Sequence, residues 1–447
     1  MKVFSRMNIL KLSTNAGGGA TVAAERQARA LRHLGHTVKH LHVRQDWTCN
    51  GVKLQEDSNN IYISAPMPRF LKTDLMFQSY IADNRTTISN TYMSLWRKTT
   101  PFDQKLLEYI LVQGFDIVHC HWTSNLISSK LMKSLKANNV KIVITGHDMN
   151  HFTGACHYDA GCGGFRNGCK TCCQLISDDG AIITASMKEK LDCYINVKPH
   201  FIFPCNWLNE EYKASSIGCS LGCNSSSVLR NCIDTDFFSP AKNKEMLLRR
   251  QEFGFAEDEI LIVSGAENNH EVRKGFRYFE HAFKALNRSL YGSQFNKKIT
   301  FVAFGGGNHV LAPTHPQVRY RHLGVLKEVQ VRDLFRVADL LAFTSVEENF
   351  ANVILESLMC ACPVLGFNIG GIPDIVKPGI NGELVGDVSE FAFSEAMINL
   401  ITKRNLSQLQ SSTKAWREAS HSHYGYEYIA NQLVTLYSDV LQGELNG

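Results

Sequence analysis

At 447 residues the chain is too long for a single hydrophobic core, so its length predicts two or three domains. Hydrophobic residues make up 44% of it and charged residues 20%, which is typical of a folded globular protein and excludes a disordered or collagen-like chain. The formal charge of +5 is small for this length, and lysine and arginine are scattered. This argues against a dedicated nucleic-acid-binding protein, while an anionic small ligand or a loose contact with an acidic membrane face stays compatible.

The sequence carries no recognisable membrane span or secretion signal. No window approaches about 20 uninterrupted apolar residues, and the N-terminal apolar stretch has no small-residue cleavage site after it. We therefore expect a cytoplasmic protein. In that compartment the 14 cysteines are expected to be thiols, some of them on metal, and not disulfides.

In the first half of the chain, short apolar runs alternate with helical patterns. Residues 8–14 (NILKLST) predict a strand, GGGA follows as a glycine turn, and the spacing of Ala20, Ala24, Ala28 and Leu31 predicts a helix that ends at Gly35. Further strands are expected at residues 37–43, 116–122, 140–148, 181–186 and 200–204. Strands that alternate with helices indicate a mostly parallel sheet with helices on both faces.

A second series of the same kind follows residues 231–240, which the Asp, Ser and Pro content predicts to be a linker. Strands are expected at residues 259–265, 298–307, 339–345 and 363–367, with helices from Lys274, after Lys327 and from about Ala351. Residues 426–441 form an amphipathic pattern that predicts a last helix, long enough to return to the first domain. The expected fold is therefore α/β, with two Rossmann-like doubly wound domains and a terminal helix that crosses back.

Ligands of such sheets bind beyond the carboxyl ends of the strands, so the polar and glycine-rich segments after the strands should contain the site. One of them leads into the apolar run 350–360, which contains Glu356, with Glu348 eight positions earlier. An unpaired carboxylate inside a buried helix would cost several kcal/mol or so, hence Glu356 should accept hydrogen bonds. The amides of residues 350–353 would form a helix N-terminus suited to phosphate.

A nucleotide sugar would satisfy these features together, with ribose hydroxyls for Glu356, diphosphate for the amides and sugar hydroxyls for Glu348. The alternative is that Glu356 pairs with a lysine or arginine and Glu348 is a solvated loop residue. Two neighbouring segments favour the ligand. Gly370 and Gly371 allow close approach of backbone, although such a pair also occurs in plain turns. Arg273 and Lys274 at a predicted helix start need an anion or water nearby.

Residues 345–376 (SVEENFANVILESLMCACPVLGFNIGGIPDIV) closely resemble the E-x7-E region and glycine loop of retaining glycosyltransferase family 4, which has the GT-B fold. RKGF resembles the family's basic donor-phosphate motif, residues 231–240 its interdomain segment, and residues 8–31 its N-terminal strand, glycine loop and helix. Residues 145–175 resemble a subgroup from exopolysaccharide and capsule clusters, the colanic-acid-type transferases.

The resemblance implies roles for individual residues. Glu348 would hold donor-sugar hydroxyls, Glu356 the ribose, and the segment Asn349, Phe350, Ala351, Asn352 and Val353 the diphosphate, with Gly370 and Gly371 close by. Lys274, helped by Arg273, would neutralise the leaving nucleoside diphosphate. His147 would lie near donor sugar and acceptor, and Gly18 and Gly19 would face the phosphates or the acceptor. His147, Glu348 and Lys274 are the predicted catalytic residues.

Family members keep the anomeric configuration and generally need no metal for catalysis. A front-face displacement, in which the donor phosphate helps deprotonate the acceptor, would make stabilisation of the leaving group dominant. This sequence departs from the family pattern in three places: no arginine follows residues 264–268, Ala351 replaces a usual Gly or Pro, and Cys232 replaces the Gly of the interdomain segment.

Cys156, Cys162, Cys169 and Cys172 follow a C-x5-C-x6-C-x2-C spacing in a glycine-rich loop. Four thiolates would close a tetrahedral structural zinc site, but because one C-x-x-C pair is present and not two, the spacing favours reduced or paired cysteines that bind no metal. His147, His151, His157 and Cys173 are substitute ligands.

Three other functions stay open at this point: a nucleotide-sugar epimerase, an NAD-dependent oxidoreductase and a binding protein without turnover. The oxidoreductase lacks support because the glycines after the first strand are consecutive and no acidic residue ends the second. With the resemblance, the sequence predicts a retaining transferase that moves a sugar from a UDP- or GDP-sugar to a saccharide acceptor. The acceptor is expected to be lipid-linked, and the reaction to belong to exopolysaccharide, capsule or lipopolysaccharide synthesis. It would act in the cytoplasm with peripheral contact to the inner membrane face.

The predicted domains are residues 1–235 on the acceptor side, with the cysteine-rich loop at 150–175, residues 236–425 on the donor side, and residues 426–447 as the terminal helix. Residues 59–100 contain no motif that predicts a function.

Overall fold

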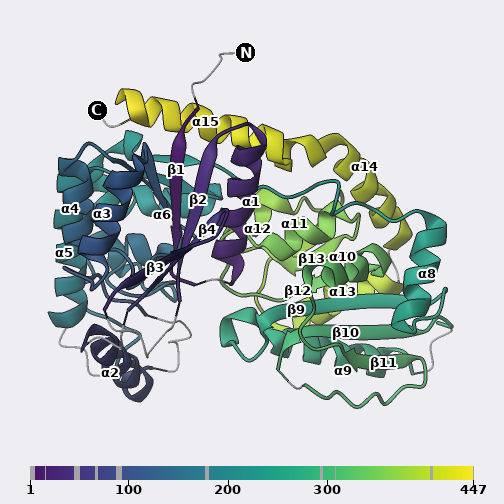
Figure 1. Ribbon diagram of the computed structural model, residues 1–447. Helices are drawn as coiled ribbons and strands as arrows, with labels where there is room; N and C mark the ends of the chain where they lie inside the picture. Colours follow the sequence, from purple (N-terminus) through teal and green to yellow (C-terminus); the bar gives the residue numbers. More distant parts are fainter. Residues whose placement is uncertain are drawn as a thin grey trace. The chain divides into compact units, whose positions relative to one another are not determined.

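The computed structural model describes residues 6–15, 17–44, 51–65, 69–86, 93–176, 181–291, 295–307, 309–402 and 406–445. The chain divides into two compact units (Figure 1). Unit 1 comprises residues 1–232 and 426–447, and unit 2 comprises residues 233–425. Among the described residues, no helix combines the length and the apolar character that a membrane crossing requires.

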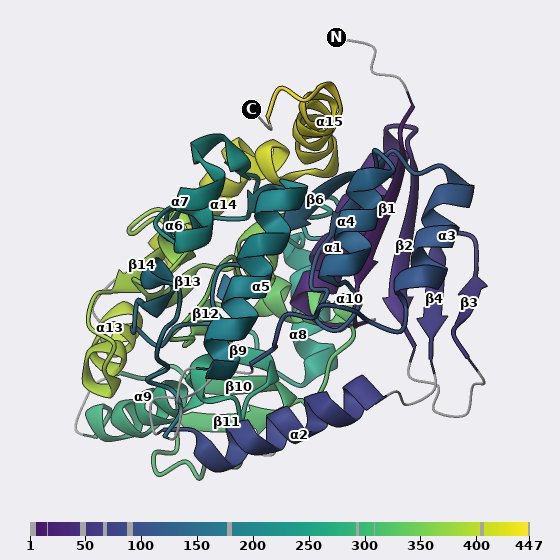
Figure 2. The same ribbon diagram turned by 90° about the vertical axis from the view of Figure 1, so that its left-hand side faces the viewer.

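Unit 1 is built on a sheet with the strand order β3-β4-β2-β1-β5-β6-β7-β8, in which β3 alone pairs antiparallel among the described strands. Figure 2 shows β1, β2, β4 and β3 side by side at one edge. The strands are β1 (Asn8–Ser13), β2 (Thr37–Val43), β3 (Lys53–Glu56), β4 (Asn60–Ser64), β5 (Ile117–Cys120), β6 (Lys141–Thr145), β7 (His200–Phe203) and β8 (Ser226–Val228). The order reverses between β1 and β5, which is the topological switch point of a Rossmann-like sheet.

The helices of unit 1 cover both faces of this sheet. They are α1 (Gly19–His33), α2 (Arg69–Asn84), α3 (Asp103–Gln113), α4 (Ser129–Ala137), α5 (Ala181–Val197), α6 (Asn206–Lys213), α7 (Ser216–Leu221) and α15 (Tyr426–Gln442). Short 3-10 turns lie at η1 (Met149–His151), η2 (Gly164–Asn167) and η3 (Cys223–Ser225).

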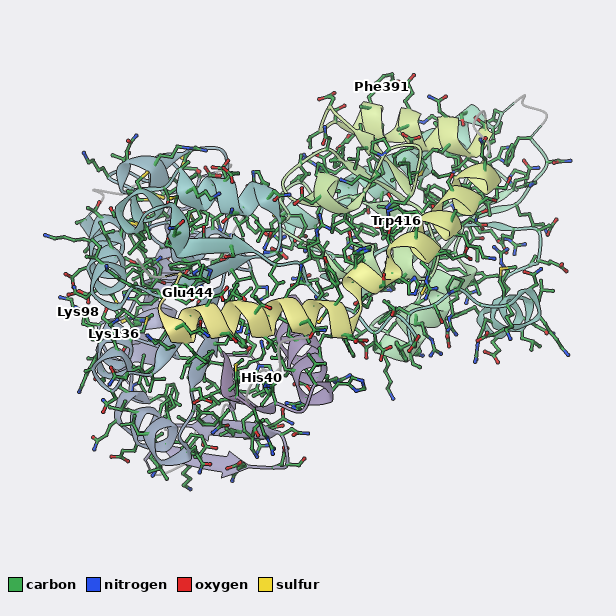
Figure 3. All side chains as sticks on the ribbon, turned by 90° about the horizontal axis from the view of Figure 1, so that it is seen from above. His40, Lys98, Lys136, Phe391, Trp416 and Glu444 are labelled. Carbon is green, nitrogen blue, oxygen red and sulfur yellow. The ribbon has the colours of Figure 1, made fainter. Side chains whose placement is uncertain are left out.

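Helix α15 returns to unit 1 after the chain has passed through unit 2. It packs against α1, and Leu433, Val434 and Tyr437 are buried in one core cluster with Ile9 and Leu31. Glu444, which Figure 3 labels, lies in the turn that follows the last residue of this helix, Gln442. The amphipathic pattern of residues 426–441 therefore predicted the helix correctly.

Unit 2 is a second Rossmann-like sheet, with the order β11-β10-β9-β12-β13-β14 and parallel pairing between neighbours. Its strands are β9 (Ile260–Asn268), β10 (Ile299–Gly306), β11 (Val318–His322), β12 (Leu340–Phe343), β13 (Val364–Phe367) and β14 (Gly382–Val385). The order reverses between β9 and β12. Ligands of open α/β sheets bind at such a reversal, so these two strand ends identify the place to look for a site.

The helices of unit 2 are α8 (Asn243–Phe253), α9 (Phe276–Ser289), α10 (Glu328–Val337), α11 (Asn352–Met359), α12 (Ile372–Ile375), α13 (Glu390–Thr402) and α14 (Leu406–Tyr424), with a 3-10 turn at η4 (Val272–Lys274). Helices α9 and α13 pack together, and their Phe279, Phe283, Phe393 and Met397 form one core with the sheet.

One predicted strand is wrong: residues 181–186 begin helix α5. Their content of Ile and Thr favours a strand when the six residues are taken alone. The buried positions of the helix, Ile183, Ser186, Met187, Lys190, Cys193, Tyr194 and Val197, recur every three to four residues. That helical period becomes visible only when the window extends to residue 197.

Candidate functional site

The switch point of unit 2 contains a small pocket at the carboxyl ends of β9 and β12. β9 ends in the small and polar residues 264–268, and Thr344 and Ser345 follow β12 directly. The pocket is lined by Ser264, Gly265, Ala266, Asn269, Lys274, Phe276, Ala342, Phe343, Thr344 and Ser345. Lys274 is therefore placed where the fold favours a ligand.

Arg273 and Lys274 lie in the 3-10 turn η4, which ends at Gly275 and precedes α9, so the long helix begins after them and not at Lys274 as predicted. Hydrogen bonds join this turn to the loop after β12: Val346 N–H donates to the Arg273 carbonyl at 2.9 Å and Thr344 Oγ1 donates to the Lys274 carbonyl at 2.9 Å. These bonds fix both cations against the segment that carries Glu348.

Glu348 forms ion pairs with both cations. Its Oε2 lies 2.8 Å from Lys274 Nζ and 3.4 Å from Arg273 Nη1, and Arg273 Nη1 also donates to the Glu347 carbonyl at 3.0 Å. Glu348 is buried, with 9% of its surface exposed. Burial by itself raises the pKa of Glu348, but the charges of Lys274 and Arg273 outweigh it and hold the pKa below its ordinary value.

The loop from Glu348 to Ala351 leads into helix α11, which begins at Asn352. The N–H groups in the first turn of a helix have no acceptor within the helix and favour an anion. Gly371 N–H donates to the Glu348 carbonyl at 3.1 Å, which places the glycine pair after β13 beside the same loop. Gly370 has φ 50°, the left-handed region that glycine adopts readily. Three adjacent segments of unit 2 thus contain the predicted residues Arg273, Lys274, Glu348, Asn349, Phe350, Ala351, Asn352, Val353, Gly370 and Gly371.

Glu356 differs from the expectation of a carboxylate inside a helix that is buried on nearly every side. Helix α11 buries Ile354, Leu355, Ser357, Leu358 and Met359 but leaves Asn352, Val353 and Glu356 partly exposed. These three positions share one side because residues four apart in a helix lie above one another. Glu356 thus lies one turn from Asn352 on the partly exposed side, and the buried, ion-paired carboxylate of the region is Glu348.

The remaining predicted site residues, His147, Gly18 and Gly19, belong to unit 1. His147 follows β6 and lines a pocket beyond the carboxyl ends of β5 and β6. Gly18 has φ 89° and precedes the first residue of α1, Gly19, in the loop after β1. The pocket around His147 is lined by Leu95, Trp96, Arg97, His121, Trp122, Thr123, Ser124, Asn125, Ile127, His147, Asp148, Asn150 and His151.

Sequence reasoning missed several residues of this pocket. Trp96 and Arg97 come from the segment 59–100, in which no motif was recognisable, and they reach the pocket through tertiary contacts. Arg97 Nε donates to Asn125 Oδ1 at 2.9 Å, and the indole N–H of Trp96 donates to Ser129 Oγ at 2.8 Å. The pocket therefore offers two tryptophans and a guanidinium beside His147.

His147 hydrogen-bonds to a second histidine, since its Nε2 lies 2.9 Å from His121 Nδ1. Burial lowers the pKa of His147 to about 4, although the nearby Asp148 carboxylate acts in the opposite direction. A histidine with this pKa is neutral at physiological pH, so one ring nitrogen donates and the other accepts.

The four predicted zinc ligands lie in the loop between η1 and α5. Cys156 and Cys169 are buried and Cys162 is exposed. The N–H groups of Gly154 and Gly164 donate to the sulfurs of Cys169 and Cys162 at 3.2 and 3.3 Å. Within the described part of the chain, no three His, Cys, Asp or Glu side chains are placed to hold a metal ion. Structural zinc stays a prediction.

Comparison with known proteins agrees with this geometry. Residues 258–403, which lie in unit 2, match the family model described as glycosyl transferases group 1. N-acetyl-alpha-D-glucosaminyl L-malate synthase of Bacillus anthracis is 33% identical over 210 residues, which cover 46% of this chain and 52% of that protein. D-inositol 3-phosphate glycosyltransferase of Corynebacterium glutamicum is 24% identical over 232 residues, 49% of this chain and 52% of that protein. The matches thus span about half the length of these relatives.

Solved structures match over nearly the whole chain. Sucrose-phosphate synthase of Thermosynechococcus elongatus has a TM-score of 0.64 at 15% identity, covering 98% of this chain and 100% of that one. HepE of Anabaena, in complex with UDP and glucose, has a TM-score of 0.61 at 14% identity, covering 97% of this chain and 100% of that one.

The class of protein follows from the fold: two Rossmann-like α/β units with the GT-B architecture, as the sequence predicted. Within that class, unit 2 is similar to the glycosyl transferases of group 1, and the named relatives are similar to this chain over about half their length.

Proposed function

We propose that the chain transfers a sugar, with retention of anomeric configuration, from a nucleoside-diphosphate sugar to a saccharide acceptor. The observation that carries this proposal is the pairing of buried Glu348 with Lys274 and Arg273 beside the start of α11, at the switch point of unit 2. Two cations and a helix N-terminus in one place suit a diphosphate, and a carboxylate among them suits sugar hydroxyls.

In the mechanism that follows, Lys274 and Arg273 hold the diphosphate and offset the charge that develops as its bond to the sugar breaks. Glu348 balances their charge before the donor binds, which keeps both cations in position. When the diphosphate takes over part of that role, Glu348 is available to accept hydrogen bonds from donor-sugar hydroxyls. Glu356, on the partly exposed side of α11, is assigned to the ribose.

The donor and acceptor classes extend the proposal. HepE of Anabaena was solved with UDP and glucose, and starch synthase IV of Arabidopsis thaliana with ADP and acarbose. For this chain we propose a UDP- or GDP-sugar. The resemblance of residues 145–175 to colanic-acid-type transferases favours a lipid-linked saccharide in exopolysaccharide, capsule or lipopolysaccharide synthesis, handled by a cytoplasmic protein with peripheral membrane contact. The same loop is the proposed zinc site, and catalysis needs no cofactor.

Titration calorimetry of the full chain with UDP, GDP, ADP and their glucose conjugates tests the donor class. Micromolar to millimolar binding of one diphosphate is expected, and Lys274→Met should weaken it about tenfold or more because a direct phosphate contact is lost. Lys284→Met is the matched control, since Lys284 is exposed on α9 of the same unit. Equal affinity in both variants, or binding of NAD and none of the diphosphates, would exclude the proposal.

A further inference from the structure

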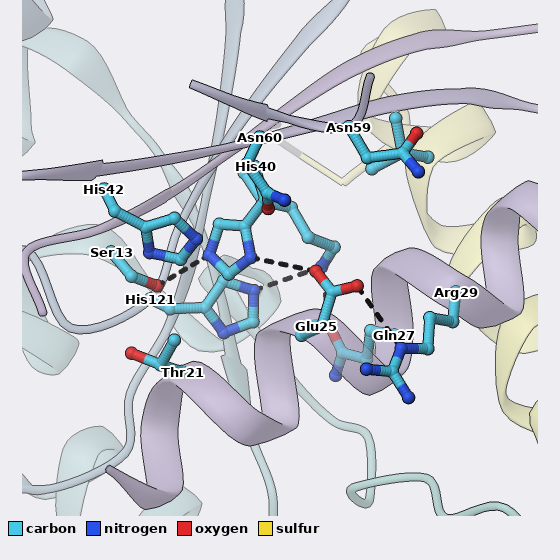
Figure 4. Close-up of polar contacts among 12 residues, drawn as sticks. Ser13, Thr21, Glu25, Gln27, Arg29, His40, His42, Asn59, Asn60 and His121 are labelled. Atoms are coloured by element: carbon cyan, nitrogen blue, oxygen red, sulfur yellow. Dashed lines mark hydrogen bonds and ion pairs between the residues drawn. The ribbon is translucent and has the colours of Figure 1, made fainter. Parts of the chain in front are cut away.

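A fully buried lysine lies on β1 in unit 1, within a cluster of histidines. Lys11 has 0% of its surface exposed, and so do His119 on the neighbouring strand β5 and His121 directly after that strand. Lys11 Nζ donates to Gln27 Oε1 at 2.8 Å and lies 3.2 Å from His119 Nδ1 and 3.1 Å from His121 Nε2. Figure 4 shows Gln27 and His121 with the adjoining His40, Ser13 and Glu25.

The position of this cluster follows from the register of the sheet. Ile9, Val38, Ile117 and Val143 are buried together on the face that α1 and α15 cover, and Ile9 pairs with Val38 and with Ile117. Since side chains alternate between faces, the residues two positions further along share that face. They are Lys11, His40, His119 and Thr145, of which Lys11 pairs with His40 and with His119. Ser13, His42, His121 and His147 come two positions later in the chain. The face thus changes from apolar to polar toward the carboxyl ends of the strands.

The hydrogen bonds have a direction because an ammonium group has three N–H donors and no acceptor. Charged Lys11 donates to His121 Nε2, so the proton of neutral His121 is on Nδ1. His121 Nδ1 then donates to His147 Nε2 across 2.9 Å. A neutral His147 that accepts at Nε2 carries its own proton on Nδ1.

We propose that Lys11 is a positioning residue for the pocket around His147: through His121 it holds His147 as the Nδ1–H tautomer, with Nε2 occupied. His147 then serves the pocket as a hydrogen-bond donor and not as a proton acceptor. This assignment concerns unit 1 alone, and its effect on catalysis rests on the proposed function.

The charge states of the groups in the cluster support hydrogen bonds that run from Lys11 through His121 to His147. Burial lowers the pKa of His121 well below its ordinary value and that of His147 to about 4, so both rings are neutral. Burial also lowers the pKa of Lys11, to about 7. The titratable and charged groups that face Lys11 are Glu25 and Arg32 on α1, His40 and His42 on β2, His119 on β5, His121 after β5, His147 after β6, Tyr437 on α15 and Cys232 after β8.

Several of these neighbours titrate far from neutrality. Burial lowers the pKa of His40 to about 4 and raises that of Cys232 to about 12. Burial alone would raise the pKa of Glu25, but His40 and Arg32 bring it to about 2. Loss of the Lys11 proton near pH 7 removes the obligatory donor, since a neutral amine can also accept a hydrogen bond from His121.

Two-bond proton–nitrogen spectra of the full chain with nitrogen-15 histidine report each ring's tautomer without an activity assay. At pH 6 the wild type should show His147 in the Nδ1–H form, and this preference should weaken with a midpoint near pH 7. His147→Phe assigns the signal. A wild-type His147 in the Nε2–H form at pH 6, or one that does not change between pH 6 and 9, would overturn the proposal.

Two variants interrupt the chain of hydrogen bonds at different points. Lys11→Met removes the donor and keeps an unbranched side chain, and a buried charge can often be replaced by an apolar group without loss of stability. His121→Phe removes the relay and keeps a ring. Both should leave His147 as a mixture of tautomers at pH 6. His200→Phe is the control, because His200 is buried in β7 of the same unit and bonds to Ser227. An unchanged His147 in both relay variants, or an equal change in the control, contradicts the role of Lys11.

The kinetic measurement separates this role from a structural one. Once the donor is identified, Lys11→Met should lower kcat about tenfold, since one hydrogen bond to the reacting complex loses its orientation, while the KM for donor stays unchanged. A rise in donor KM with kcat unchanged would contradict the positioning role. If the proposed transferase activity is absent, the tautomer spectra still decide the inference about Lys11.

Discussion

At the scale of single residues, Glu348 is a buried carboxylate that two cations keep ionised. Removing one partner of a buried ion pair leaves the other charges uncompensated, which costs more free energy than the pair itself contributes. Lys274 and Arg273 would be left in this condition if Glu348 lost its charge. The arrangement therefore links the stability of unit 2 to the ionisation of one group.

Glu348→Gln should lower the free energy of unfolding of unit 2 by about 2 kcal/mol at pH 7, because both cations lose their partner. The folded-state pKa of Glu348 lies below the unfolded value, so its contribution is present at neutral pH and disappears as pH falls through the folded-state pKa. Urea unfolding of wild type and variant at pH 7 and pH 3 measures the difference, which should shrink in acid.

Glu395→Gln controls for the loss of a carboxylate, since Glu395 is exposed on α13 of the same unit. A difference between wild type and Glu348→Gln that is the same at both pH values would mean that the carboxylate contributes through shape and not through charge.

Residue-level reasoning from the sequence expected Glu356 to be a carboxylate inside a buried helix. The argument that an apolar run cannot bury an unpaired charge applied to Glu356, yet α11 leaves that residue partly exposed and Glu348 is the buried one. A run of apolar letters does not reveal which side of a short helix faces the core. The same argument could have found Lys11, a lysine within the apolar strand NILKLST. Its histidine partners come from other strands and become its neighbours only through sheet register.

At the scale of elements, the turn before α9 depends on a glycine. Gly275 has φ 64°, and a Cβ built on it would lie 2.1 Å from the carbonyl oxygen of Thr344. The close approach lets Thr344 and Val346 hold the Lys274 and Arg273 carbonyls. A side chain at position 275 would have to separate the turn from the loop after β12.

Gly275→Ala should therefore destabilise unit 2 by more than Gly254→Ala. Both glycines have positive φ, 64° and 74°, so both variants carry the left-handed cost of about 1 kcal/mol. At Gly254 the nearest atom to a new Cβ is a guanidinium nitrogen of Arg321 at 3.6 Å, an ordinary contact. Urea unfolding midpoints measure how much more stability Gly275→Ala loses than Gly254→Ala. Diphosphate affinities of the two variants show whether binding is lost in the same order. Equal losses of both quantities would show that the close approach to Thr344 does not matter.

Prediction of elements succeeded where a long period was visible and failed where the window was short. Helix α15 shows its amphipathic period over 17 residues. Residues 181–186 were predicted as a strand because of their local β propensity, although they begin helix α5. The tertiary partners that bury Met187, Lys190 and Tyr194 of this helix are remote in sequence. Strands β3, β4, β8, β11 and β14 were not predicted, and four of them, β3, β8, β11 and β14, end the strand orders of the two sheets.

At the scale of the whole molecule, both sheets reverse their order beside the first strand of the unit, and the chain ends in the unit where it began. The order within each sheet follows from the alternation of strands and helices that the sequence displays. The packing partner of α15 could not be derived from its sequence. An apolar helix face must be buried, but the sequence of the helix does not reveal which residues cover it. In the structure that cover includes Ile9 and Leu31 of unit 1.

Unit 1 should therefore depend on residues that follow unit 2 in the chain. Leu433 on α15 is fully buried, so Leu433→Ala should lower the free energy of unfolding of unit 1 by about 2–5 kcal/mol, because it leaves a cavity between α15 and the sheet. Thr435→Ala, at an exposed position of the same helix, should change stability by less than about 0.5 kcal/mol. Hydrogen exchange in urea resolves the two units separately: β1 and β5 should lose protection in Leu433→Ala while β9 and β12 keep theirs. Equal loss in all four strands would show that the two units unfold as one and that α15 does not belong to unit 1 energetically.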